Sequence, residues 1–392
     1  MEEWKTYRLG DVVNVLDYMR VPLSSKQRES RKGPYPYYGA QGIIDHVDSF
    51  LFDGEYLLIA EDGENLKSKK QDIAQIARGR YWVNNHAHIV ESNGRCDIRY
   101  ICYLLNQIDL SGYITGSAQP KLNQANLLAI ELRLPSVEVQ KKVSDVLSTF
   151  DNKIAINNRI NPNLEEQARA LYKSWFVDFE PFKGGNFMDS ELGLIPKGWR
   201  VGTLSELGDI VAGGTPSKKK PEYYTNNGIS WLTPKDLSVK CNKFTARGEI
   251  DITEDGYKNS STKLMPRGSV LFSSRAPIGY ISIAKGDICT NQGFKSVVPT
   301  YAGTAYLYYW LCENTEAIEA QASGSTFKEA SGSLMRSFPA LVPEKSVIDS
   351  FEKELSPILN EQEILEEEIN HAEQIRDSLL PRLMSGELFM NC

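Results

Sequence analysis

Residues 143–175 read VSDVLSTFDNKIAINNRINPNLEEQARALYKSW, and the spacing of their side chains decides the fold. One set of positions recurs in alternating steps of four and three: Val143, Leu147, Phe150, Ile154, Asn157, Asn161, Leu164, Ala168, Leu171 and Trp175. This is the period of a coiled coil. At 1.5 Å per residue, the stretch predicts a helix about 50 Å long.

A second segment near the end of the chain follows the same rule. Its seam consists of Ile348, Phe351, Leu355, Ile358, Gln362, Leu365, Ile369, Ala372, Arg376, Leu379 and Leu383. An apolar seam is unstable when it faces water, and each helix has one obvious partner in the other. We therefore expect an intramolecular antiparallel coiled coil.

Two asparagines interrupt the first seam. Asn157 and Asn161 are either half-exposed polar positions beside a kink at Pro162 or buried residues that fix the register of the pair. The spacing leaves both alternatives open. Pro357 in the second segment predicts a bend near the start of that helix.

Outside the helices the chain is written twice. Four phrases recur in the same order: Leu9-Gly10-Asp11-Val12-Val13 as Leu207-Gly208-Asp209-Ile210-Val211, Ile76-Ala77-Arg78-Gly79 with Asn84 as Ile283-Ala284-Lys285-Gly286 with Asn291, Tyr100–Leu105 as Tyr306–Leu311, and Gly116-Ser117 as Gly324-Ser325. The period is too long for a solenoid of small repeats. It predicts two similar domains, and duplex DNA is the commonest partner with matching two-fold symmetry.

Each repeat mixes short β-type runs with turns, ends at Pro135 or Pro343, and then becomes helical. The predicted fold class is α+β with approximate two-fold symmetry. Residues 1–135 and 179–343 would form the two mixed domains. Residues 136–178 and 344–386 would form two spacer helices that hold the domains apart.

The net charge of −7 argues against a nucleic-acid binder until its distribution is considered. Residues 344–382 alone carry 4 Lys/Arg and 11 Asp/Glu, a balance of −7 that equals the whole excess. The two repeated domains are therefore close to neutral, and their basic loops are free to face phosphates.

Basic residues gather in four places in the two domains. They are Lys26, Arg28, Arg31 and Lys32; Lys67, Lys69 and Lys70; Lys218, Lys219 and Lys220; and Lys235, Lys240, Lys243 and Arg247. Such a run is usually only a solvated loop. The two-fold repetition and the neutral domains favour DNA contact instead, chiefly with phosphates.

Catalytic patterns are missing from the sequence. It holds no phosphate-binding Gly-x-x-x-x-Gly-Lys-[Ser/Thr] loop, no Gly-x-Gly-x-x-Gly fingerprint, and no Asn-Pro-Pro-aromatic run of the adenine methyltransferases. His86 and His88 lack a third ligand at metal-site spacing. We expect no catalysis, no cofactor and no metal. Unpatterned cysteines, no signal peptide and no membrane-length apolar run predict a cytoplasmic protein.

Longer phrases carry a family resemblance. They include Tyr37-Tyr38-Gly39-Ala40-Gln41-Gly42, Glu61-Asp62-Gly63, Gly116–Leu122, Leu171–Phe179, Trp231-Leu232-Thr233-Pro234-Lys235-Asp236-Leu237, Ser274–Gly279, Thr290–Lys295 and Leu380–Leu388. With the helix layout, they resemble the specificity subunit of type I restriction–modification enzymes over nearly the whole chain. Only the second helix departs, because Pro343 is not followed by a counterpart of Gln140.

The resemblance implies a subunit without catalysis of its own. Each mixed domain would be a target recognition domain that reads one half of a bipartite double-stranded DNA site. The helices would dock two modification methyltransferase subunits, which restriction (motor) subunits would join. A stand-alone two-domain DNA-binding regulator and a coiled-coil scaffold are the alternatives.

Overall fold

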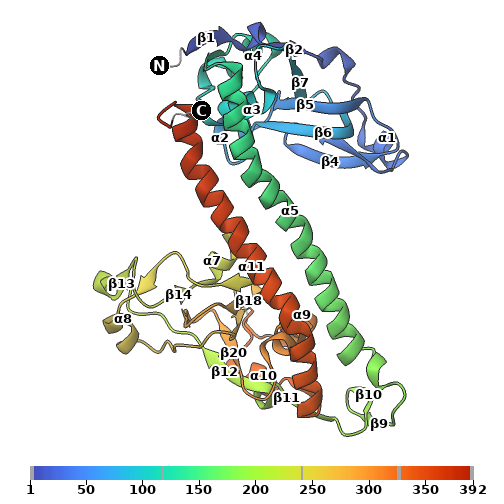
Figure 1. The fold of residues 1–392 in the computed structure, drawn as a ribbon. Coiled ribbons are helices and arrows are strands. Elements are labelled where there is room, and N and C mark those ends of the chain that lie inside the picture. Colours follow the sequence, from blue (N-terminus) through green and yellow to red (C-terminus); the bar gives the residue numbers. More distant parts are fainter. Residues whose placement is uncertain (1–3, 117–118, 240–241, 325–327, 389–392) are drawn as a thin grey trace. The chain divides into compact units, whose positions relative to one another are not determined.

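The computed structural model describes residues 4–116, 119–239, 242–324 and 328–388. Ser117, Ser325 and Lys240, which the sequence singled out, lie outside these ranges. The chain divides into two compact units: Met1–Ile154 with His371–Cys392, and Ala155–Asn370. Each unit thus contains one mixed domain and parts of both long helices (Figure 1).

The first unit is built on a six-stranded sheet of order β2-β7-β5-β6-β3-β4. Its strands are β2 (Val13–Val15), β7 (Ala87–Ser92), β5 (Phe52–Ala60), β6 (Ala74–Val83), β3 (Tyr35–Gly39) and β4 (Gly42–Val47). Around it lie β1 (Lys5–Arg8), α1 (Ser25–Glu29), α2 (Asn65–Ser68), α3 (Ile98–Gln107), α4 (Gln124–Leu128) and β8 (Glu131–Leu134).

The second unit has a five-stranded sheet of order β12-β20-β17-β18-β15. Its strands are β12 (Gly208–Ala212), β20 (Lys295–Pro299), β17 (Val270–Ser274), β18 (Ile278–Ala284) and β15 (Phe244–Thr245). The other strands are β9 (Phe187–Ser190), β10 (Gly193–Pro196), β11 (Arg200–Thr203), β13 (Tyr224–Thr225), β14 (Trp231–Leu232), β16 (Asp251–Ile252), β19 (Cys289–Thr290) and β21 (Pro339–Val342). Its short helices are α6 (Leu204–Leu207), α7 (Pro234–Val239), α8 (Glu254–Lys258), α9 (Thr304–Gln321) and α10 (Gly332–Ser337).

The two domains repeat one register. In the first, β3 runs parallel to β6 with Tyr37 opposite Trp82. In the second, β14 runs parallel to β19 with Trp231 opposite Cys289. Trp82 and Cys289 are separated along the chain by the same interval as Ile76 and Ile283, which begin one of the repeated phrases. The predicted α+β duplication is confirmed.

Two 40-residue helices complete the fold, α5 (Val137–Phe176) and α11 (Lys345–Met384). In the first unit Arg376 Nη1 lies 2.9 Å from Asp151 Oδ1. In the second, Asn157 donates to Glu368 at 2.9 Å, and the rings of Phe176 and Phe351 lie 4.8 Å apart. Within each unit the two helices therefore run antiparallel.

The structure places every seam position at a buried or half-buried site. Val143, Leu147, Phe351, Leu355 and Leu365 are buried, and Phe150, Ile154, Leu164, Leu171, Ile369 and Leu379 are half-buried. Asn157 is buried and hydrogen-bonded, whereas Asn161 Oδ1 is buried without a hydrogen-bond partner among the described residues. Both helices continue through Pro162 and Pro357.

The buried face of α5 is wider than the seam. Ser144, Ser148, Tyr172 and Phe176, one position beyond seam residues, are also buried. Tyr172 and Phe176 belong to the core of the second domain. Each helix therefore packs on a domain as well as on its partner. Within the residues described, no helix is both long and apolar enough to cross a bilayer.

Candidate nucleic-acid interface

A polar cluster lies where the strands of the first domain end. Arg20 Nη1 contacts Glu61 at 2.7 Å, and Lys121 Nζ contacts the same carboxylate at 3.1 Å. His88, which is 1% exposed, lies 2.6 Å from Asp17. Two of the family phrases meet here.

This cluster has the donor set of a metal site, because ligand atoms of Asp17, Glu61 and His88 lie within 4.8 Å of one another. The positive charge is already supplied by Arg20 and Lys121. His88 Nε2 donates to the carbonyl oxygen of Leu122 at 2.7 Å, and His88 Nδ1 lies 2.6 Å from Asp17 Oδ2, so both ring nitrogens already have partners within the domain. The cluster is a structural ion-pair network.

The second domain has a similar ion-paired cluster, in which the basic residues lie at the strand ends and the acidic residue lies in the loop. Arg275 and Lys295 contact Glu329 at 3.7 and 3.1 Å. Arg275 forms a β-bridge with Glu329, as Asp62 does with Lys121 in the first domain. Each domain thus closes its strand ends with an ion-paired loop.

A lysine-rich loop presses against these strand ends in the second domain. A Cβ at Gly213 would lie 1.9 Å from the carbonyl oxygen of Asn291, and one at Gly214 would lie 2.4 Å from Thr262 N, so only glycine fits. The loop carries Lys218 and Lys219, which are exposed and form no hydrogen bond or ion pair with the rest of the described chain. Both remain available to phosphates.

The next predicted contacts are exposed but occupied. Lys220 Nζ donates to the Tyr223 hydroxyl at 2.9 Å, and this bond raises the pKa of Lys220. Lys235 is paired with Glu249 at 3.1 Å. Lys263 was not among the predicted DNA contacts. It follows buried Thr262 and is exposed beside the Gly213–Lys220 loop. Its position beside the loop depends on tertiary contacts that the sequence alone does not indicate.

In the first domain the basic cluster around α1 is mostly engaged. Arg28 contacts Asp45 at 3.0 Å and lies 5.2 Å from the Tyr37 ring centroid. Lys32 also contacts Asp45, and its hydrogen bond is the largest cause lowering the pKa of that carboxyl to about 2. Arg31 pairs with Asp48 at 2.9 Å. Lys26 is exposed and makes no such contact in the described ranges.

The cluster near α2 is similarly divided. Lys67 Nζ donates to the carbonyl oxygen of Gly116 at 3.1 Å, and Lys69 Nζ to that of Ile108 at 2.8 Å. Lys70 is exposed and unpaired within the described chain. Of the predicted basic contacts in this domain, Lys26 and Lys70 therefore offer their charge most freely.

Lys243 corrects our sequence interpretation. Its side chain is 7% exposed, so it faces the protein interior and not a phosphate. Lys243 Nζ donates to Glu165 of α5 (2.6 Å), Tyr309 of α9 (2.5 Å) and Gln362 of α11 (2.8 Å). The sequence could not separate it from the loop lysines around it, because burial depends on the tertiary contact.

Further carboxylates of α11 hold the second domain. Glu352 accepts the N–H groups of Ala305 and Tyr306 at the start of α9, and Glu366 accepts those of Lys243 and Phe244. Glu363 pairs with Arg267 at 2.6 Å, and Glu367 pairs with Lys285. The concentrated acidity of residues 344–382 is thus used to bind this domain.

The first domain is held differently. Asp97 caps α3 with its own carboxylate, and Gln140 of α5 accepts the N–H of Asp97 at 3.0 Å. The second domain has no Gln at the matching position, and Glu352 supplies the corresponding helix contact. The departure noted in the sequence therefore replaces one polar contact with another.

The duplicated α+β domains, the paired helices and the exposed basic loops define a two-domain protein of the DNA-binding class. The chain matches the family described as Type I restriction modification DNA specificity domain over residues 1–166 and 196–374. It belongs to this family of type I specificity subunits.

Curated relatives agree with this assignment. The MjaIX specificity subunit of a type I restriction enzyme from Methanocaldococcus jannaschii is 37% identical over 190 residues, which are 46% of this chain and 44% of the relative. The HindI specificity subunit from Haemophilus influenzae is 24% identical and aligns over 99% of this chain and 100% of its own. The crystal structure of the type I restriction–modification S subunit from M. genitalium has a TM-score of 0.71, at 14% identity, and covers 97% of this chain and 96% of that one.

Proposed function

We propose that this chain is the DNA sequence-recognition subunit of a type I restriction–modification complex and acts without catalysis of its own in the cytoplasm. Residues 1–135 and 179–343 read the two halves of a bipartite double-stranded site. Residues 136–178 and 344–386 space the domains and dock two modification methyltransferase subunits. Restriction subunits join through these.

The observation that carries the proposal is the parallel strand register that the two domains share at equivalent positions of the repeat. Two copies of one reader fit a target split into two blocks. Base contacts specify sequence locally, whereas phosphate contacts hold the whole complex on the duplex. Each domain therefore sets one block.

We assign phosphate contact first to the unpaired surface lysines Lys26, Lys70, Lys218 and Lys219. Lys32, Lys67, Lys69, Lys220 and Lys235 are exposed but must share their charge with a protein partner. Arg28 and Arg31 serve mainly the packing of their own domain. Lys243 is excluded because it is buried.

Mapping adenine methylation in DNA from cells that carry this chain and its cognate modification subunit tests the proposal. We expect a motif of two short blocks around a fixed gap. Exchanging residues 1–135 for the domain of a relative should change one block only. A change in both blocks, or methylation that ignores the chain, contradicts the proposal; the second result favours a stand-alone regulator.

The phosphate assignment has a separate test. Replacing Lys218 and Lys219 with Ala should weaken binding to all sequences and reduce the salt dependence by about one unit of slope for each phosphate that is no longer bound. Lys353→Ala serves as the comparison, because this exposed lysine lies on α11 and not on the loop. Undiminished binding of the double variant at both low and high salt removes this loop from the interface.

Inserting four residues after Asn152 tests the helices as a spacer. We expect the gap to lengthen, or methylation to be lost, while both sequence blocks stay the same. Altered blocks contradict a spacing role.

A further inference from the structure

β15 in the second domain has no counterpart among the described residues of the first. It lies parallel to β18, with Phe244 opposite Ile283 and Thr245 opposite Ala284. Ile283 N donates to the carbonyl oxygen of Lys243 at 2.8 Å, and Lys285 N donates to that of Thr245 at 3.0 Å. In the repeated phrase, the first-domain equivalents of Ile283 and Lys285 are Ile76 and Arg78 on β6.

At those positions β6 presents an open edge. The carbonyl oxygens of Tyr81 and Ile73 accept hydrogen bonds from Leu51 N and Ala60 N, on the side of β5. Because backbone direction alternates along a strand, the N–H and C=O groups of Ile76 and Arg78 point to the opposite side. β3 covers that side only at Trp82 and Val83. No described backbone group pairs with β6 at Ile76 or Arg78 on this side. Unpaired strand edges are templates for adding a strand.

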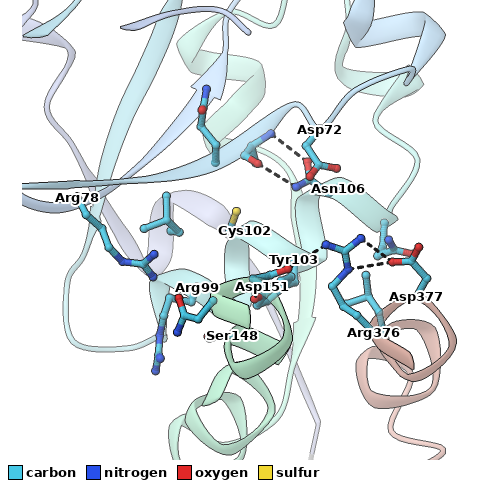
Figure 2. A pocket seen from close by; sticks show the side chains of 16 residues that line it. Asp72, Arg78, Arg99, Cys102, Tyr103, Asn106, Ser148, Asp151, Arg376 and Asp377 are labelled. Carbon is cyan, nitrogen blue, oxygen red and sulfur yellow. Dashed lines mark hydrogen bonds and ion pairs between the residues drawn. The ribbon is translucent and has the colours of Figure 1, made fainter. Parts of the chain in front are cut away.

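A cavity of about 310 Å³ lies beside this edge. It is lined by Gln75, Ile76 and Arg78 of β6, Cys102 and Tyr103 of α3, and Asp151 and Arg376 of the long helices. In Figure 2, Arg78 lies at one side of the cavity and Arg376 with Asp377 at the other. Cys102 and Tyr103 correspond to Tyr308 and Tyr309, whose rings lie 4.5 and 4.7 Å from Lys243 Nζ. The cavity is thus the place that Lys243 fills in the second domain.

The charge of the cavity suits a cation. Asp72, Asp151 and Asp377 line it. Arg78 is matched by Glu55, and Arg99 by Asp97 and Asp145 outside the lining. Within the described part of the chain this leaves Arg376, which contacts Asp151 and Asp377, as the guanidinium facing the three lining carboxylates. Asp72 forms no ion pair among the described residues, and burial raises its pKa.

We propose that the open edge of β6 and this cavity form a docking site for an extended segment of a partner protein. The segment adds parallel to β6 and places a lysine among Asp72, Asp151 and Tyr103. Strand addition of this kind draws affinity from main-chain hydrogen bonds and specificity from side-chain pockets. The assignment of the partner to another subunit of the assembly rests on the proposed function.

A peptide with the sequence of residues 242–247, NKFTAR, is the probe. With benzoylphenylalanine in place of Phe244, it should crosslink to residues 72–78 or 102–106 of the full-length protein. Fluorescence anisotropy should show at least fivefold weaker binding for the Lys243→Met peptide, and for the protein variant Asp72→Asn. Glu131→Gln, an exposed carboxylate of the same domain, should bind as wild type. N-methylation of Thr245 in the peptide should also weaken binding, because it removes a strand hydrogen bond.

Crosslinks confined to the second domain, or binding indifferent to both the lysine and Asp72, overturn the proposal. A chain that dimerises until Asp72→Asn makes it monomeric identifies a second copy as the occupant and also overturns it. Methylation mapping is independent of this assay, because the peptide experiment uses the purified chain alone. Failure here therefore leaves the DNA-reading assignment intact.

Discussion

In the first unit the long helices meet the domain through buried Leu147, Leu380 and Leu383, with polar contacts from Gln140, Asp145 and Asp151 beside them. In the second unit Glu165, Glu352 and Glu366 accept hydrogen bonds from buried groups of the domain. Both domains share a register, so the difference does not come from the fold. It comes from which side chains the helices supply. Apolar burial involves no titrating group and no charge that salt can screen, whereas buried carboxylates depend on every donor that satisfies them. The same fold can therefore be attached to the helices by different sets of side-chain contacts.

The largest effect should come from the apolar side of this comparison. Leu147→Ala removes a fully buried side chain from the first core and should lower the free energy of unfolding by about 2–5 kcal/mol. Urea unfolding at 0.1 and 1 M NaCl should give the same loss. Ile156→Ala, on the same helix but 52% exposed, is the control and should change stability little. A strongly salt-dependent loss would contradict the apolar attachment.

Lys243→Met should have the next largest effect, about 2–4 kcal/mol, because Glu165, Tyr309 and Gln362 lose a shared donor. The loss stays below that of a fully buried pair, since the Glu165 side chain is 28% exposed. Hydrogen exchange should accelerate at β15 and β18. Lys235→Met, which breaks a surface pair, should cost less than about 1 kcal/mol. Equal losses in the two variants would contradict a stabilising role for the buried contacts of Lys243.

The carboxylates of α11 should make the attachment of the second domain to its helices depend on pH. Burial raises the pKa values of Glu352 and Glu366 above their ordinary 4.5, so the folded state binds more protons than the unfolded one in that range. Stability should therefore rise as pH falls from 7 toward 4.5. The double variant Glu352→Gln/Glu366→Gln should flatten the curve in urea titrations. An unchanged slope would show that these groups do not titrate on unfolding.

The smallest effect should come from the ion pair between Arg267 and Glu363, which is partly exposed. The side chain of Arg267 is 61% exposed, so Arg267→Gln should cost no more than about 1 kcal/mol at low salt. The cost should shrink at 1 M NaCl, because salt weakens the interaction of exposed charges. A loss that persists in high salt would place this pair with the buried contacts.

The sequence predicted the seam and the duplication because both are periodic. Leu147 and Phe351 follow from the four–three spacing alone. Tyr172 and Phe176 do not, because their burial needs the second domain as a surface. The acidity of residues 344–382 was visible, but Glu352 and Glu366 look like a solvated helix face until the N–H groups they accept are known. The prediction that Lys243 contacts DNA was wrong for the same reason, because the sequence does not show which lysines are buried.

The acidic composition of α11 has a consequence for how a duplex approaches the second domain. Lys243, Lys285 and Arg267 are consumed by glutamates, so the helix-bound side of that domain presents little free positive potential to a polyanion. The Gly213–Lys220 loop keeps its charge. If the loop binds phosphates as proposed above, a field of this polarity should turn an incoming DNA toward the loop before any base is read and disfavour encounters with the helix side.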